Sequence, residues 1–117
     1  MTLLSRQFNS KQAQIRFDVE SATSENPLDA MDMTFLNYRL ANVQVAEQVT
    51  LSKPDIVWRP QIAVKDIRYR EGILELDGEW YAGEIQKILV SMLAFRLEEC
   101  GLHPFHASAV RYRGKTI

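Results

Sequence analysis

The sequence predicts an α+β protein in which an antiparallel sheet of about five to seven strands packs on one long helix. Over the first 79 residues, apolar and polar side chains alternate in several short stretches, which is typical of strands with one solvated face. After Gly78 the apolar spacing changes to the three-and-four pattern of a helix. At 117 residues the chain is long enough to bury a core of its own, so we expect residues 1–117 to form a single domain.

The first predicted strand covers residues 13–20, where four apolar residues alternate with four polar ones. Residues 21–30, SATSENPLDA, are mostly turn-forming types and predict a loop. The pattern over 33–40 is mixed and leaves strand and short helix both open. Valine and leucine recur over 43–51 and favour another extended stretch.

Two further β elements precede the helix. DIVW at residues 55–58 predicts a short strand that ends before Pro60, because the residue before a proline avoids the α region. The clearest β signal is a hairpin over residues 62–76. We place its turn at Glu71-Gly72, since glycine supplies the positive φ that short hairpin turns need.

The helix is predicted near residues 80–100. Apolar residues recur at helical spacing between Tyr81 and Leu97, and charged residues fall on the opposite side. Asp77 is a predicted N-terminal cap, and Gly101 is well placed to end the helix, with Pro104 beyond it. The apolar face is wide, so we expect the helix to lie across the sheet.

Composition and charge exclude several classes of partner. Apolar residues make up 46% and charged residues 25% of the chain, as in ordinary globular proteins, and the net charge is −1. Such a charge creates no field that attracts nucleic acid or an anionic membrane, and no apolar run is long enough to span a bilayer. The only cysteine, Cys100, cannot form an intramolecular disulfide and is expected to be a packed thiol. We therefore expect a cytoplasmic protein without nucleic-acid or membrane partners.

The sequence ends in RYRGKTI, and Gly-Lys-Thr is the end of the P-loop motif. The first glycine of that motif would stand at residue 109, which is alanine, and the residues between are β-branched, aromatic or basic types that resist the geometry of an anion nest. No helix can follow within this chain. Gly114-Lys115-Thr116 is therefore not a phosphate loop, and we predict a tight turn at Arg113-Gly114 between two strands.

Two histidines are the first candidates for chemistry. His103 and His106 have the spacing H-x-x-H, but zinc sites take three or four protein ligands, and no further ligand stands at a recognised spacing. His106 and Ser108 are two apart in a predicted strand and so share a face. No acid is placed to orient the histidine for a nucleophile–base pair. We expect no metal site and no catalytic residue in this chain.

Three carboxylates and three aromatic residues are weaker candidates. Glu75, Asp77 and Glu79 alternate, but acid–base work would need one of them to be buried with a raised pKa. A hairpin edge running into a helix cap explains them better. The aromatic residues could form a binding patch, but packing of sheet against helix is the commoner role. They are Trp58, Trp80 and Tyr81.

The last third of the chain carries a family resemblance. An apolar helix is followed by GLHPFHASAV, a short basic turn and GKTI. This order resembles the stretch immediately upstream of the P-loop in HPr kinase/phosphorylase-like proteins, whose nucleotide domain is related to that of phosphoenolpyruvate carboxykinase. The matching residues are Leu102, His106, Ala107, Ser108, Ala109, Val110, Gly114 and Ile117.

The resemblance implies a non-catalytic N-terminal portion of an ATP-dependent phosphotransfer protein. The P-loop, the acidic metal ligand and the base of that family would all lie beyond Ile117, so ATP and Mg²⁺ are expected only in a longer parent. In that parent His106 and Ser108 would line the approach to the active site. The partner would be the chain's own C-terminal P-loop domain or a separate protein.

Two other functions remain open. The chain could be a free-standing regulatory or protein-interaction module, homodimeric through an exposed strand edge. It could also be a small enzyme that uses His106, for which the sequence offers the least support.

Overall fold

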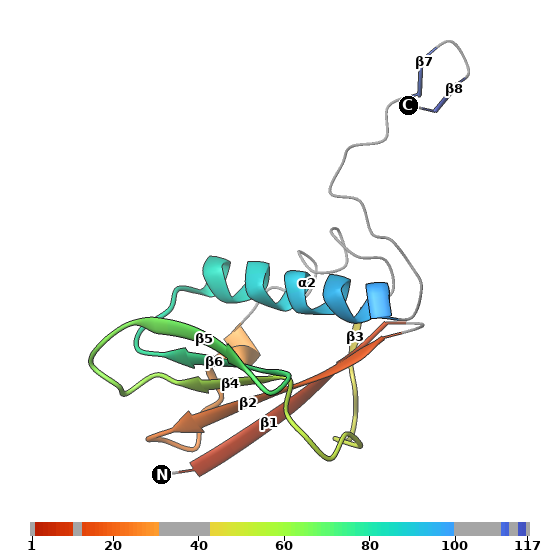
Figure 1. Ribbon diagram of the computed structural model, residues 1–117. Coiled ribbons are helices and arrows are strands. Elements are labelled where there is room, and N and C mark those ends of the chain that lie inside the picture. The colour runs from red at the N-terminus through yellow and green to blue at the C-terminus, as the bar shows by residue number, and fades with distance from the viewer. Residues whose placement is uncertain (1, 11–12, 31–42, 100–110, 113–114, 117) are drawn as a thin grey trace.

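The computed structural model describes residues 2–10, 13–30, 43–99, 111–112 and 115–116. A six-stranded sheet has the order β3-β1-β2-β4-β6-β5, and one long helix, α2, lies across one of its faces (Figure 1). The predicted α+β class is confirmed, with a mostly antiparallel sheet of the expected size packed on one helix.

The elements have the following bounds. The strands of the sheet are β1 (Thr2–Asn9), β2 (Gln14–Ser21), β3 (Gln44–Val45), β4 (Ile56–Arg59), β5 (Asp66–Arg70) and β6 (Ile73–Asp77). The helices are a 3₁₀ turn, η1 (Pro27–Ala30), and α2 (Ala82–Glu99). A separate two-stranded sheet joins β7 (Arg111–Tyr112) and β8 (Lys115–Thr116) as an antiparallel pair, which are the strands predicted on either side of Arg113-Gly114. That turn lies outside the described residues.

The sheet is mixed at its centre. β1 pairs antiparallel with β2 and β3, and β5 pairs antiparallel with β6. β4 runs parallel to both of its neighbours, β2 and β6. The parallel pairs arise because β5 passes to the sheet edge first, and β6 then returns into the space between β5 and β4. The alternation of apolar residues predicts each strand but carries no information on the order of strands.

The hairpin is formed as predicted. Arg70 faces Ile73 across a two-residue turn, in which Glu71 has φ 52° and Gly72 has φ 81°. Positive φ at both positions is the type I′ turn, whose twist matches that of paired strands. Gly72 meets this requirement without strain.

Strand β1 was not predicted. Its sequence, TLLSRQFN, lacks regular alternation, yet every residue of it pairs with β2. The pairing is stabilised from outside the strand, since the buried Gln7 side chain accepts the backbone N–H groups of Thr50 and Leu51 at 2.8 and 3.1 Å. The ambiguous segment 33–40 lies outside the described residues.

The helix predicted near residues 80–100 is confirmed as Ala82–Glu99, but Asp77 is not its cap. Asp77 ends β6, while the first turn of α2 is closed by Glu84, whose carboxylate accepts the Tyr81 N–H at 3.1 Å. This contact is one half of a capping box. Lys65, 2.8 Å away, and the Tyr81 amide hold the pKa of Glu84 below its ordinary value.

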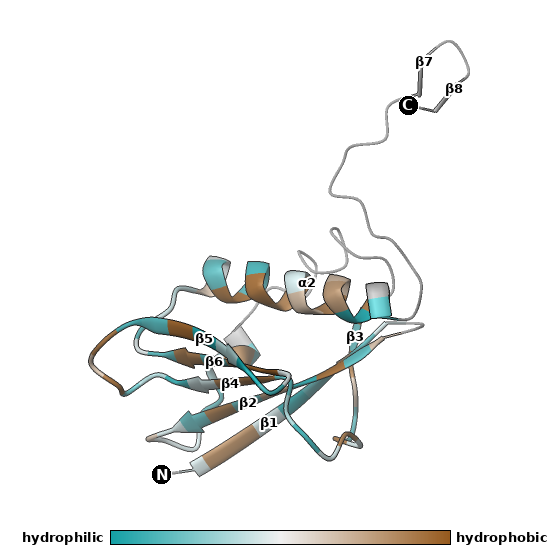
Figure 2. Ribbon diagram, in the orientation of Figure 1, coloured by the Kyte–Doolittle hydropathy of each residue, from teal (hydrophilic) through white to brown (hydrophobic). Residues whose placement is uncertain are grey.

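The hydrophobic core lies between the sheet and α2, and Figure 2 shows the apolar side of the helix facing the strands. Because residues that pair across strands share a face, alternate positions of the central strands all point toward the helix. The core residues are Phe8, Ile15, Phe17, Val19, Leu28, Val43, Ile56, Trp58, Leu76, Ile85, Leu89, Met92 and Leu93.

A charged clamp fixes the C-terminal half of α2 to the sheet. The Asp55 carboxylate, at the start of β4, accepts the Arg16 backbone N–H at 2.8 Å and the Arg96 guanidinium at 2.7 and 3.0 Å. Arg96 also donates to the Gly72 carbonyl at 3.1 Å. Burial disfavours the charged form of Arg96, but the Asp55 carboxylate outweighs it and raises the pKa of Arg96. We call Asp55 and Arg96 the helix clamp.

We predict that breaking the helix clamp destabilises the fold. Arg96→Met keeps most of the side-chain stem but leaves the shielded Asp55 carboxylate without its cation, which should cost about 1–3 kcal/mol. The control Arg6→Met removes a more exposed pair with Asp29 and should cost less than about 1 kcal/mol. Urea unfolding measures both, and equal losses would contradict the assigned role.

A second prediction concerns Gly78, which has φ +89° and packs against the chain that leads into β5. A Cβ there would lie 2.8 Å from the Lys65 Cα, so Gly78→Ala should destabilise by about 2 kcal/mol or more. Gly83→Ala is the matched control, because its Cβ would meet open space in the first turn of α2, and it should be neutral or slightly stabilising. Thermal unfolding separates the two, and similar melting temperatures would overturn the prediction.

Candidate functional site

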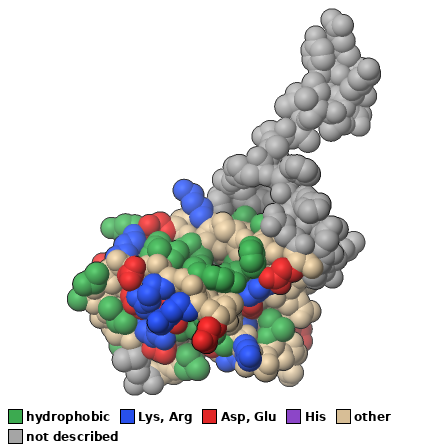
Figure 3. Space-filling model, in the orientation of Figure 1, with side chains coloured by type: hydrophobic (Ala, Val, Ile, Leu, Met, Phe, Trp, Pro, Cys, Tyr) green, Lys and Arg blue, Asp and Glu red, His purple; other side chains and the backbone are tan. Residues whose placement is uncertain are grey.

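An apolar groove lies between α2 and the edge hairpin. Its volume is about 420 Å³, and Figure 3 shows apolar side chains gathered around a hollow beneath the helix. We call it the edge groove. Its lining residues are Ile67 and Tyr69 of β5, Leu74 of β6, and Lys87, Ile88, Ser91, Met92 and Phe95 of α2.

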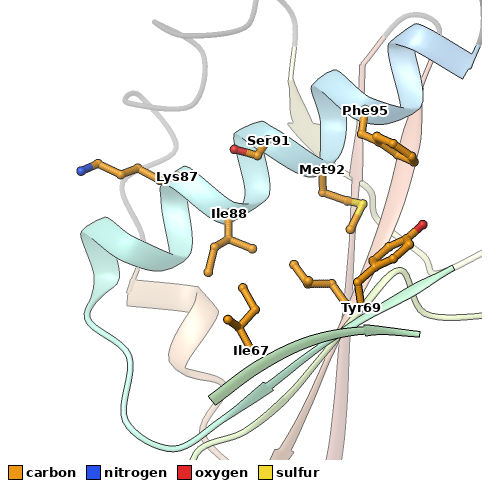
Figure 4. Close-up of a pocket in the computed structure, with 8 residues that line it drawn as sticks. Ile67, Tyr69, Lys87, Ile88, Ser91, Met92 and Phe95 are labelled. Atoms are coloured by element: carbon orange, nitrogen blue, oxygen red, sulfur yellow. The ribbon is translucent and has the colours of Figure 1, made fainter. Parts of the chain in front are cut away.

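The strand side of the edge groove comes from period-two spacing on β5. Ile67 and Tyr69 point up toward the helix (Figure 4), and they are 49% and 52% exposed. They belong to β5, which is the last strand on its side of the sheet. The same alternation that buries the inner strands therefore leaves these two side chains open to solvent.

The helix side of the edge groove is formed by α2 residues that are spaced about one turn apart. Ile88, Met92 and Phe95 project from α2 toward β5 (Figure 4). Phe95, 44% exposed, meets Tyr69 edge to face with ring centroids 6.3 Å apart, and this contact closes one end of the groove. The groove is thus deep enough to receive an apolar side chain and remains open along the β5 edge.

Polar groups contribute little to the lining. The Lys87 side chain points away from the groove (Figure 4), which leaves Ser91 and the Tyr69 hydroxyl as the polar groups of the lining that stay near it. Catalytic sites need several convergent polar groups to orient a substrate and to move protons. The edge groove has the chemistry of a binding surface for apolar groups.

The opposite face of the sheet is ionic. Arg68 pairs with Asp77 at 2.7 Å and with Glu75 at 3.2 Å, and Arg70 pairs with Glu75 at 2.8 Å. Arg59 adds a pair with Glu20 at 3.2 Å. We call this surface the charged face.

The pKa shifts on the charged face follow from these pairs. Hydrogen bonds from Arg70 and then Arg68 hold the pKa of Glu75 below its ordinary value, although burial opposes them. The carboxylates of Asp77 and Asp66 raise the pKa of Arg68. Glu75 is therefore kept ionised, as an ion-pair partner and not as a general acid.

The structure shows where the aromatic residues and the carboxylate Glu79, the weaker candidates of the sequence, lie. Trp58 is buried in the core and donates to the Gly78 carbonyl at 2.9 Å, and Trp80 packs against that core. Tyr81 is 72% exposed and Glu79 is exposed. Trp58 and Trp80 line a common small hollow, and the Lys65 ammonium lies over the Trp80 and Tyr81 rings, 4.4 and 5.8 Å from their centroids.

His106 and Ser108, with His103 and Cys100, lie outside the described residues. Within the described ranges no cluster of three or more metal-ligating side chains occurs. In that same part of the chain, the helices are too short or too polar to cross a membrane.

Sequence reasoning did not find the edge groove. Ile67 and Tyr69 fall within the predicted hairpin over residues 62–76, and Phe95 falls within the predicted helix. Periodicity does not show which apolar residues stay uncovered, since that depends on β5 being an edge strand. Comparisons with known proteins add no assignment: no protein-family model matches the chain, and no curated protein or solved structure matches it.

The charged face leads to a prediction of pH dependence. Because the pKa of Glu75 is lower in the folded chain than in the unfolded chain, its contribution to stability is present above its ordinary value of 4.5 and is lost as the pH falls through the folded value. Glu75→Gln should therefore lower the melting temperature near neutral pH, and the difference from the unaltered chain should shrink steadily with acidification below pH of about 5. Melting curves over that range check this.

The exposed Glu47 provides a control, since Glu47→Gln should change the melting temperature little at any pH. A Glu75→Gln difference that stays constant down to strongly acidic pH would contradict the ion-pair origin.

Proposed function

We propose that this chain is a non-catalytic protein-docking domain whose edge groove receives an apolar segment of a partner. The observation that carries the proposal is the cluster of half-exposed large apolar side chains around the groove, Ile67, Tyr69 and Phe95. Contiguous exposed apolar surface mostly marks an interaction site. Covering it would gain roughly 25 cal/mol for each Å² of apolar area removed from water.

We further propose that the partner is a nucleotide-binding domain of the HPr kinase/phosphorylase type, and that this chain is the N-terminal portion of such a phosphotransfer protein. The order helix, HASAV, turn and GKTI supports this proposal. ATP and Mg²⁺ would then be bound by the partner domain, and His106 and Ser108 would face its active-site approach. The setting would be the cytoplasm.

The alternative is a free-standing regulatory or interaction module that forms a homodimer. The observation in its favour is β5, an uncovered edge strand with exposed apolar side chains. For a small enzyme based on His106 the described residues offer no evidence, because His106 lies outside them.

The groove proposal predicts binding of an apolar probe. The 117-residue chain should enhance the fluorescence of an anilinonaphthalene sulfonate dye, and Phe95→Asp should reduce this enhancement severalfold by placing a charge in the groove. Val64→Asp, at a position 72% exposed and away from the groove, is the matched control and should leave it unchanged. Equal effects of the two variants would rule out the groove as the binding surface.

The parentage proposal predicts a specific continuation of the coding sequence. A glycine-rich loop ending in Gly-Lys-Ser or Gly-Lys-Thr should follow Ile117, after one apolar strand. If that region is produced as a separate chain, it should bind the 117 residues, and Phe95→Asp should weaken the complex while Val64→Asp does not. A stop codon directly after Ile117, with no adjacent gene for such a domain, would refute the parentage and leave the docking groove intact.

A further inference from the structure

In the part of the chain that the structure describes, the longer of the two sheet edges has no strand paired to it. The sheet ends in β3 on one side and in β5 on the other, and β3 has only two residues whereas β5 has five. All residues of β5 except Arg68 are exposed. An edge of this kind presents backbone groups that can pair with another strand.

The two-residue turn decides which backbone groups of β5 point outward. In such a hairpin the residues flanking the turn, Arg70 and Ile73, exchange hydrogen bonds, so alternate residues of β5 point away from β6. These are Ile67 and Tyr69. In agreement, the Ile67 N–H is turned outward and donates to the Asp66 carboxylate at 2.8 Å.

We propose that β5 pairs antiparallel with β5 of a second copy of this chain, with Arg68 at the two-fold axis. This register is the one in which all five residues of the strand face a residue of the same strand. Ile67 then lies opposite Tyr69 of the second copy, and these outward-facing residues exchange the backbone hydrogen bonds. The inference goes beyond the docking function proposed above and does not rest on it.

Charge complementarity favours a second copy over another extended peptide. In this register Asp66 lies opposite Arg70 of the second copy, and the two-fold axis repeats the pair. Just outside the strand, the same symmetry places Lys65, whose ammonium is paired with Glu84 of its own chain, opposite Glu71. The strand thus carries its own complementary charges in the order that antiparallel self-pairing needs.

The apolar side chains agree with the same register. Residues that pair directly share a face of the sheet, so Ile67 and Tyr69 of the two copies meet on the helix side. Both are half exposed in the single chain. Pairing would cover part of this area and join the two edge grooves across the axis.

The two Arg68 side chains that meet at the axis carry like charges, but each is neutralised by carboxylates of its own chain. The Arg68 guanidinium is hydrogen-bonded to the carboxylates of Asp66, Glu75 and Asp77, at distances between 2.7 and 3.3 Å. These bonds direct it toward β6 and away from the axis. Pairing also requires the Asp66 carboxylate to release the Ile67 N–H, which then bonds to the second copy. Arg70 of the second copy, which is paired with Glu75 of its own chain at 2.8 Å, becomes an added partner of Asp66.

Sedimentation equilibrium of the 117-residue chain tests the proposal over loading concentrations from about 1 μM to about 1 mM, since a short edge forms a weak, reversible interface. We expect a monomer–dimer equilibrium. Asp66→Arg and Arg70→Asp should each raise the dissociation constant about tenfold or more, because each places two like-charge pairs across the axis. Circular dichroism confirms that each variant is folded.

Mixing the two variants is the decisive measurement. A dimer of one Asp66→Arg chain and one Arg70→Asp chain restores opposite charges at both pairs, so it should associate at least as well as the unaltered chain. Glu47→Gln, remote in sequence from β5, should not alter association. A chain that stays monomeric at every concentration, or variants that do not rescue each other, would overturn the proposal, and neither result would affect the dye and partner-domain tests of the edge groove.

Discussion

The position of α2 over the sheet depends on one carboxylate, that of Asp55. Asp55 lies immediately before β4, and its backbone is hydrogen-bonded to both neighbouring strands. The Asp55 N–H donates to the Arg16 carbonyl, and the Asp55 carbonyl accepts the Leu74 N–H, at 2.8 Å each. Its side chain bonds β2 again through the Arg16 amide and holds α2 through Arg96. Arg96 in turn reaches the hairpin turn at Gly72. One residue, Asp55, thus connects three strands through its backbone and side chain, and its carboxylate also holds the helix.

This connection explains why the two faces of the sheet differ so sharply. With α2 fixed over the central strands, the alternate residues on that side form the core, and those on the other side can be charged. Arg59, Arg68 and Arg70 are all paired with carboxylates there, so the charged face presents a balanced network and not an anion-binding patch. β5 is the edge strand, and its Ile67 and Tyr69 stay half exposed on the apolar side although α2 side chains approach them. The edge groove is a direct result of where the helix is held.

Local sequence predicted the local structure well and the long-range structure poorly. The hairpin turn at Glu71-Gly72 and the helix pattern over residues 80–100 depend on neighbours in the chain, and both were predicted. Strand β1 depends on Gln7 reaching Thr50, a contact between distant segments that no periodicity reveals. The parallel pairing of β4 likewise depends on strand order. The groove was missed for the same reason, because exposure of Ile67 follows from β5 being last in the sheet. The Asp77 cap was misplaced since β6 extends through that residue.

Docking into the edge groove and self-pairing of β5 both involve Ile67 and Tyr69, the first through their side chains and the second through their backbone. Ile67 and Tyr69 direct their side chains into the edge groove, while their backbone groups point outward along the free edge. A strand paired on one side only retains more freedom than a strand paired on both sides. Self-pairing through β5 would hold the backbone of both residues and so reduce the conformational entropy that their side chains lose when a partner enters the groove. Self-pairing would also cover part of the Ile67 and Tyr69 surface that a docked segment would contact, so dimerisation and docking act on the same two side chains.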